Sequence, residues 1–280
     1  MSPLELFDRD GYAIFENAIN SDALDGLRGH IDRIVEDFDP AGVTTVFSTD
    51  DDQGHSRDNY FLTSGDKTRF FFEDGVFADD GALLVDKRTA LNKIGHAMHD
   101  LDPGFSTSCR SGEFAMVAEA VGMTSPLLLQ SMVIFKNPEI GGEVTPHTDH
   151  TFLRTEPQSV IGLWLAIDEA TVENGCLWAL PGGHRIAVKK RFQRTADDTA
   201  TEMIVLDDTP YPDDGWVPLE AAPGTIIALH GSLPHRSEPN TSTDPRLAFT
   251  LHCIEADAVY PDDNWLRRSD LPLQGFVHQK

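Results

Sequence analysis

Two potential metal ligands, His147 and Asp149, stand two positions apart in the segment Gly-Glu-Val-Thr-Pro-His-Thr-Asp-His. On an extended chain their side chains would point to the same face. A third candidate ligand, His235, follows 88 residues later in Gly-Ser-Leu-Pro-His-Arg-Ser. Two histidines and a carboxylate on one face of a metal form the facial triad that binds non-haem Fe(II) and leaves coordination positions open. A His-x-Asp pair alone is weak evidence, because most such pairs are hydrogen-bonded or solvated on a loop.

A basic residue at a fixed distance strengthens this hypothesis. Arg246 lies 11 residues after His235 and opens the segment Arg-Leu-Ala-Phe-Thr-Leu-His-Cys. Alternation along a strand would place Arg246 on one face with Ala248, Thr250 and His252. An inward-facing arginine is costly unless it meets an anion, and a guanidinium suits a carboxylate. A dicarboxylate that chelates the metal would be such an anion, although an arginine at a sheet edge with its charge in water fits the sequence at least as well.

The helices and strands that must position these residues follow from two different sequence patterns, one in each half of the chain. The first half favours helices at 21–38, roughly 82–100 and near 112–121, with Ser21 as the first N-cap, and a short strand at 11–19. Helices followed by a run of strands predict an α+β fold, with helices on one face of a β-sandwich or jelly roll. No linker divides residues 1–280, which we interpret as a single domain, and 185–215 reads as a long loop. The five later strand candidates are 126–136, 159–170, 175–183, 224–231 and 246–256.

The composition excludes several classes of protein. With 40% hydrophobic and 24% charged residues, the chain is typical of a soluble globular protein. Its net charge of −24, from 46 acidic and 22 basic residues, opposes binding to nucleic acid and to anionic membranes. We expect a small-molecule substrate, no nucleic acid and no membrane partner, and we favour a monomer.

Cysteine usage and the first residues indicate a cellular location. Cys109, Cys176 and Cys253 are widely spaced without a Cys-x-x-Cys motif, which is typical of a reducing compartment and of neither a disulfide framework nor a zinc site. The N-terminal segment carries acidic residues where a signal peptide needs basic and apolar regions. No apolar run reaches the ~18 residues of a membrane span. The expected location is the cytoplasm.

Several long motifs occur together in an order that resembles the phytanoyl-CoA dioxygenase family of Fe(II)/2-oxoglutarate oxygenases. They are LNKIGHAMHDLDPGF, QSMVIFKNPEIGGEVTPHTDHTFLRTEP, ATVENGCLWALPGGH and ALHGSLPHRS, followed by the segment that Arg246 opens. The resemblance covers nearly the whole chain. It implies a double-stranded β-helix (jelly-roll) core with flanking N-terminal helices.

The resemblance also assigns roles to single residues. It implies that His147, Asp149 and His235 bind Fe(II), and that Arg246 binds the distal carboxylate of 2-oxoglutarate. Taken alone, a lysine in a helix is usually solvated, a methionine in a strand is usually core packing, and a serine in a turn needs no ligand. The residues that the resemblance places beside the cosubstrate are Lys93, Met132, Trp164 and Ser237.

The activity implied is that of a 2-oxoglutarate-dependent non-haem iron dioxygenase. Such an enzyme uses O2, releases succinate and CO2, and hydroxylates an unactivated C–H bond of a small molecule. A CoA thioester carries several phosphates and matches a chain of charge −24 poorly. One alternative is a cupin-like metal-binding or isomerase protein without 2-oxoglutarate, which would have no use for Arg246; another is a non-catalytic member of the family. The roles of His150 and His184 stay open.

One segment reverses the sign of the charge. Residues 185–194 hold five of the 22 basic residues, and by the resemblance they lie near the mouth of the active site. A basic rim would attract an anionic substrate. The sequence therefore suggests an anionic substrate, although a solvated loop balanced by nearby acids explains the same pattern. The five residues are Arg185, Lys189, Lys190, Arg191 and Arg194.

Overall fold

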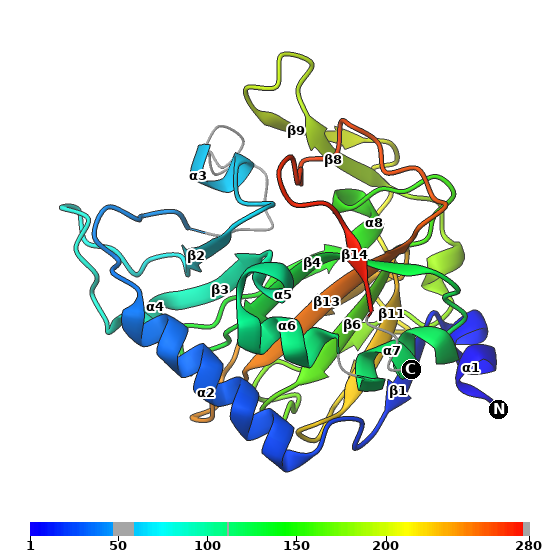
Figure 1. Cartoon of the computed structure of the whole chain (residues 1–280), viewed down its shortest axis with the longest axis horizontal. Coiled ribbons are helices and arrows are strands. Elements are labelled where there is room, and N and C mark those ends of the chain that lie inside the picture. The colour runs from blue at the N-terminus through cyan, green and yellow to red at the C-terminus, as the bar shows by residue number, and fades with distance from the viewer. Residues whose placement is uncertain (47–58, 111, 277–280) are drawn as a thin grey trace.

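A large antiparallel sheet forms the centre of the computed structural model, which describes residues 1–46, 59–110 and 112–276. The neighbouring strands β6, β13 and β4 alternate between residues for its two faces; Leu163, Phe249 and Val133, for example, all turn to the helix-covered side. The strand order is β1 (Tyr12–Phe15), β11 (Ile226–His230), β6 (Ile161–Ala166), β13 (Ala248–Glu255), β4 (Pro126–Ile134), β3 (Leu91–His96) and β2 (Thr68–Phe72), with β14 (Gln274–Gly275) paired to β4 (Figure 1).

A smaller sheet packs on the other face, so that the two sheets form a jelly roll. Small residues such as Ala166 and Ala248 of the larger sheet meet Leu177 and Ala179 of the smaller one, which lets the sheets approach closely around the Trp164 ring. The smaller sheet has the order β10 (Val217–Leu219), β7 (Leu177–Ala179), β12 (His235–Ser237) and β5 (Val144–His147), and a separate hairpin joins β8 (Lys190–Arg194) to β9 (Thr201–Val205).

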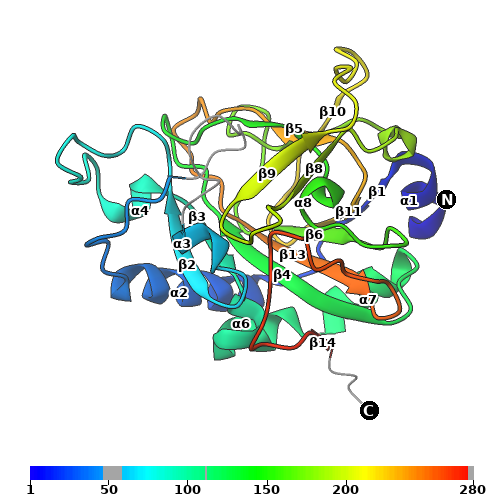
Figure 2. The ribbon, with the colours of Figure 1, turned by 90° about the horizontal axis from the view of Figure 1, so that it is seen from above.

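Helices cover the outer face of the larger sheet. Figure 2 shows α2, α6 and α7 on one side of β4 and β13, with β5, β8, β9 and β10 on the other. In α2 (Ser21–Asp37) the buried residues recur at helical spacing, and Phe105 and Phe114 from α6 (Pro103–Cys109) and α7 (Gly112–Ala120) pack on Phe249. The remaining helices are α1 (Pro3–Asp10), α3 (Asn59–Leu62), α4 (Lys87–Ala90), α5 (Met98–Leu101), α8 (Asp149–Phe152) and the 3₁₀ turn η3 (Gly183–Arg185).

The structure confirms the α+β jelly roll with flanking helices and all five predicted later strands. The side chain that caps α2 is Asn20, which accepts from the Ala23 N–H at 3.0 Å, so the prediction of Ser21 was wrong by one residue. In the described part of the chain, no helix combines the length and the apolar composition needed to cross a bilayer.

Two sequence predictions about elements were wrong. The helix expected at roughly 82–100 is divided into α4, β3 and α5, because the segment from Leu91 to His96 pairs with β2 on one side and β4 on the other. Such pairing overrides local helix propensity. The long loop expected at 185–215 contains the β8–β9 hairpin, whose strands are too short to show a clear alternating pattern.

A buried ionic cluster joins the C-terminal segment to the helical layer. We call Asp100, Arg110, Arg268 and His99 the Asp100 cluster. Both arginines donate to the Asp100 carboxylate, and His99 Nε2 lies 3.2 Å from its Oδ2. The Asp100 side chain is 4% exposed, and the two arginines compensate its charge, while burial lowers the pKa of His99 and favours its neutral ring.

Candidate active site

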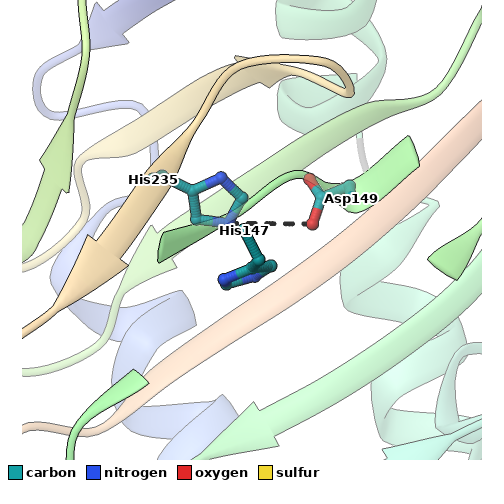
Figure 3. A group of neighbouring side chains, drawn as sticks. All are labelled: His147, Asp149 and His235. Atoms are coloured by element: carbon teal, nitrogen blue, oxygen red, sulfur yellow. Dashed lines mark ion pairs between the residues drawn. The ribbon is translucent and has the colours of Figure 1, made fainter. Parts of the chain in front are cut away.

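Three side chains from two sheet strands and one helix meet between the sheets. His147 ends β5, Asp149 begins α8, and His235 begins β12, which pairs with β5 so that His235 stands opposite His147 (Figure 3). One potential ligand atom from each residue lies within 4.8 Å of the others. Within the described ranges this is the one group of histidine, cysteine, aspartate and glutamate side chains that meets this criterion.

The hydrogen bonds of the two histidines orient their rings. His147 Nδ1 lies 2.8 Å from the Thr145 carbonyl oxygen, and His235 Nδ1 lies 3.0 Å from that of Leu233. A carbonyl accepts only from a protonated nitrogen, so Nδ1 carries a proton, and in the neutral ring Nε2 keeps its lone pair. This is the usual support for a metal-binding histidine. Burial, and then the neighbouring His235, lowers the pKa of His147 to about 4, which keeps the ring neutral.

Asp149 supplies negative charge to the same point. Burial by itself would raise the pKa of Asp149, but the neighbouring histidines, His252 and His235 foremost, hold it well below its usual range. The carboxylate is therefore ionised, and its Oδ2 is buried without a hydrogen-bond partner among the described residues. Two imidazoles, one carboxylate and an unsatisfied buried oxygen fit a divalent transition metal such as Fe(II).

The same cavity has a charged end that lies toward β3, β4 and the start of β13. Arg246 is 2% exposed, and burial lowers its pKa to about 10. Its guanidinium lies 5.6 Å from the centre of the Trp164 ring. Its Nε and Nη1 are buried, and no described group accepts from either of them. A buried guanidinium with two unsatisfied donors fits a carboxylate.

Two further charged groups at this end went unnoticed in the sequence. Lys136 is 2% exposed and donates to the carbonyl oxygens of Gly142 and Glu238 at 2.9 and 2.6 Å. Burial, and then Arg246, lowers the pKa of Lys136 to about 7. Glu73 is also buried, and burial raises its pKa despite hydrogen bonds from Asn92 and Gly142. Neither residue lies in a pattern that distinguishes it from a surface charge, so sequence reasoning missed both.

The four residues expected beside a cosubstrate all line this cavity. Lys93 lies on β3 and is buried, which corrects its expected place in a helix, and burial lowers its pKa well below the usual range. Met132 and Trp164 lie on the inner face of β4 and β6, as alternation predicts. Ser237 also lies there, but its hydroxyl already donates to the Gly175 carbonyl oxygen at 2.8 Å.

The opposite end of the cavity is aromatic. The Phe152 ring lies 5.9 Å from the His147 ring and 5.5 Å from that of Phe192, between ring centres. Phe61 stacks on Trp265 with the ring centres 4.4 Å apart. We call Phe61, Phe152, Phe192 and Trp265 the aromatic wall. Its four rings come from α3, α8, β8 and the C-terminal segment, which are distant in sequence. No local sequence motif predicted it.

The remaining sequence hypotheses have different outcomes. His150 and His184 are not among the residues that line the cavity. Most of the basic segment has partners: Lys189 contacts Asp207 at 2.6 Å, and Arg191 contacts Asp263. The basic rim that suggested an anionic substrate is therefore largely neutralised by neighbouring carboxylates.

Comparison with known proteins points to one family. The family model described as "Phytanoyl-CoA dioxygenase (PhyH)" matches residues 7–248. The chain is 40% identical over 275 residues to "Phytanoyl-CoA dioxygenase" of Arabidopsis thaliana, covering 98% of this chain and 95% of that protein. It is 41% identical over 280 residues to "Phytanoyl-CoA dioxygenase domain-containing protein 1" of Bos taurus, covering 97% and 96%.

A solved structure shares the architecture at low sequence identity. It is the structure of the epimerase SnoN in complex with Fe3+, alpha ketoglutarate and nogalamycin RO, which matches with a TM-score of 0.61. The sequence identity is 14%, and the match covers 92% of this chain and 84% of that one. At this identity the similarity demonstrates the fold alone. Since that protein is an epimerase, the jelly roll by itself does not fix the reaction.

Proposed function

Because the chain belongs to the phytanoyl-CoA dioxygenase family, we propose that it is an Fe(II)- and 2-oxoglutarate-dependent dioxygenase that hydroxylates an unactivated C–H bond of a small molecule, with release of succinate and CO2. The observation that carries this proposal is the pair of unsatisfied Arg246 donors in the same cavity as the His147, Asp149 and His235 group. A metal triad alone would fit many enzymes, whereas a buried arginine beside it calls for an anionic cosubstrate.

Each residue of the site has a defined task in this proposal. His147 and His235 present Nε2 to Fe(II), and Asp149 presents a carboxylate oxygen. Arg246 binds the distal carboxylate of 2-oxoglutarate. When bound, the iron and 2-oxoglutarate supply, with O2, the oxidising power for C–H cleavage.

Side chains around these groups orient the cosubstrate and exclude water. Lys93 and Lys136 line the same end of the cavity, where a bound carboxylate would favour their protonated forms against the effect of burial, while the Trp164 ring covers Arg246. Burial strengthens each of these interactions. Hydroxylation of this kind needs no general base, and we assign none.

The prime substrate in this proposal is not a CoA thioester. Binding several phosphates requires free basic side chains near the cavity, and most of the basic segment 185–194 is paired. We also propose that residues 1–280 form one domain, because one hydrophobic cluster draws residues from Phe7 to Phe276.

The second candidate function is a cupin-like metal protein that does not use 2-oxoglutarate. It would share the three ligands but would leave Arg246 buried without an anion, which is energetically unfavourable. This observation favours the oxygenase.

Succinate release with Fe(II), 2-oxoglutarate, O2 and a library of metabolites tests the proposal. We expect slow iron-dependent succinate formation without a prime substrate, and a marked increase with the correct compound. The matched variant His147→Ala controls for contaminating iron. If the parent protein forms no more succinate than His147→Ala under every condition, the proposed function is wrong.

A further inference from the structure

The aromatic wall stands directly beside the candidate iron site and carries no charge. Phe152 connects it to His147, and Phe192 lies between Phe152 and Phe61, with ring centres 5.5 and 6.2 Å apart. Met203 on β9 stands opposite Phe192 on β8 and also lines the cavity. The part of the cavity that adjoins His147 through Phe152 is therefore lined by aromatic and thioether groups.

One charged side chain beside this wall helps to hold it together. Arg194 donates to the carbonyl oxygens of Trp265, at 2.9 Å, and of Leu62, and to the Asp198 carboxylate at 3.0 Å. It thereby fixes the hairpin to both segments that contribute the stacked rings. With its donors turned to these acceptors and 8% exposure, Arg194 does not offer its charge to a substrate.

We infer that the part of the prime substrate that is oxidised is uncharged and apolar, and that it lies against the aromatic wall. This inference rests on the proposed function and adds the class of substrate. An anion would lose its hydration against the negative faces of the rings. A cation would meet rings that are mostly phenylalanine, a weaker cation–π partner than tryptophan, and two of these rings are already stacked face to face.

Three compounds on one scaffold test the inference: methyl 4-phenylbutyrate, 4-phenylbutyrate and 4-phenylbutylammonium. Their binding to the protein loaded with Fe(II) and 2-oxoglutarate without O2 is measured by tryptophan fluorescence and by thermal shift. We expect the ester to bind about tenfold or more tightly than either ion, because the wall must desolvate the charge. Equal binding of either ion, or no binding of the ester, overturns the inference.

Two substitutions on one hairpin locate the site. Phe192→Asp places a carboxylate in the wall and should abolish ester binding, whereas Val205→Asp adds the same charge at a position that is 55% exposed and should not. If Phe192→Asp does not fold, Met203→Ala should still weaken ester binding. Unchanged ester binding in the folded wall variant refutes the assignment. Ester binding without any succinate formation by the parent would instead refute the proposed function alone.

A second inference comes from a different observation, a third histidine beside the metal triad. His252 on β13 is 5% exposed, and its Nε2 lies 3.3 Å from Asp149 Oδ1. Opposite it on β6 stands Gly162. A Cβ atom on Gly162 would lie 3.0 Å from Asp149 Oδ2 and 3.4 Å from His252 Nε2, so a larger residue there would press on both groups of this contact.

The geometry points to His252 as a positioning residue that holds the Asp149 carboxylate in the orientation needed to bind iron. Carboxylate ligands are commonly held by a hydrogen bond from a second residue, and loss of that residue weakens metal binding by about 10- to 100-fold. The inference rests on the iron site of the proposed function and adds a residue that does not itself bind the metal.

Metal affinity without turnover tests this role. We expect His252→Leu to weaken Fe(II) binding by the apoprotein, titrated anaerobically against a chelator, by about 10- to 100-fold, and His252→Gln to restore part of it through its amide N–H. His96→Leu, at an equally buried position outside the cavity lining, should leave the affinity unchanged.

Gly162→Ala serves as an independent variant if His252→Leu does not fold. It should weaken Fe(II) binding because its methyl group displaces the Asp149 carboxylate. Fe(II) affinity within about twofold of the parent in a folded His252→Leu or Gly162→Ala variant overturns the role. Failure of the parent itself to bind Fe(II) would refute the proposed function.

Discussion

The Asp100 cluster and the Arg246 end of the cavity are both buried and both contain arginine, but they differ in hydrogen bonding. In the Asp100 cluster, Arg110 and Arg268 donate to one carboxylate. In the cavity, Arg246 has two buried donors for which the described residues provide no acceptor. Buried polar groups are nearly always paired.

This difference in hydrogen bonding distinguishes a cluster that stabilises the fold from an arginine that is available to bind a ligand. A complete ionic cluster stabilises the arrangement of the elements that supply it, here α5, α6 and the C-terminal segment. An incomplete one lowers stability until a ligand completes it. Each of the following experiments alters one side of this comparison.

Removal of a metal ligand should have the largest effect on activity. We expect His147→Ala or His235→Ala to abolish iron-dependent succinate formation without unfolding the protein, because each removes one of the three ligands while the strands that carry them stay paired. Turnover assays and circular dichroism measure both properties. Undiminished turnover in either variant would remove that histidine from the iron site. Asp149→Ala should retain weak iron binding, since an anion can occupy the vacated position.

Disruption of the complete cluster should have the largest effect on stability. Asp100→Asn leaves Arg110 and Arg268 buried without their carboxylate, and we expect a loss of about 3–5 kcal/mol in the free energy of unfolding at pH 7. Urea denaturation measures it. A loss below about 1 kcal/mol would mean that the cluster is no more than a surface ion pair.

The same variant predicts a pH dependence. Burial alone would raise the pKa of Asp100, but His99 and the two arginines hold it well below its usual value of 3.8. A depressed folded-state pKa stabilises the protein above the unfolded-state pKa, and this contribution is lost as the pH falls. The stability difference between parent and Asp100→Asn should therefore be constant at neutral pH and shrink below about pH 4. A difference at pH 2 as large as that at pH 7 would contradict this account.

Substitution of Arg246 should affect cosubstrate binding and should not lower stability, which is the opposite of the effect expected for Asp100. Arg246→Met should raise the KM for 2-oxoglutarate by about 2–5 kcal/mol of lost binding free energy, while Fe(II) affinity changes little. Without 2-oxoglutarate, its thermal stability should equal or exceed that of the parent, because a buried unpaired charge has been removed. A lower Tm together with an unchanged KM would make Arg246 a structural residue.

The smallest effect is expected in the basic segment. Lys190 is exposed at the start of β8, and we expect Lys190→Gln to change kcat/KM for the prime substrate, and its salt dependence, by less than about twofold. Steady-state kinetics at two ionic strengths measure both. A steep loss of salt dependence would restore the hypothesis of a basic rim and of an anionic substrate.

The sequence predicted those parts of the site that depend on local order. His147 and Asp149 are close because they are two residues apart, and Trp164 reaches the cavity because strand residues alternate between faces. For these residues the distance along the chain is short enough for backbone geometry to fix their relation in space. The role of Arg246 stayed open in the sequence itself, and only the family resemblance assigned it to a carboxylate.

Only the tertiary structure decided the rest. Pairing of β12 with β5 brings His235 opposite His147, pairing of β3 with β2 and β4 makes Lys93 a strand residue, and four distant segments build the aromatic wall. Strand register and packing depend on contacts between residues far apart in sequence, and local propensity carries no record of these partners. The sequence by itself therefore determined the ligand types and the strand faces that carry them. Long-range packing determined which buried charged groups have hydrogen-bond partners within the protein and which have donors left for a ligand.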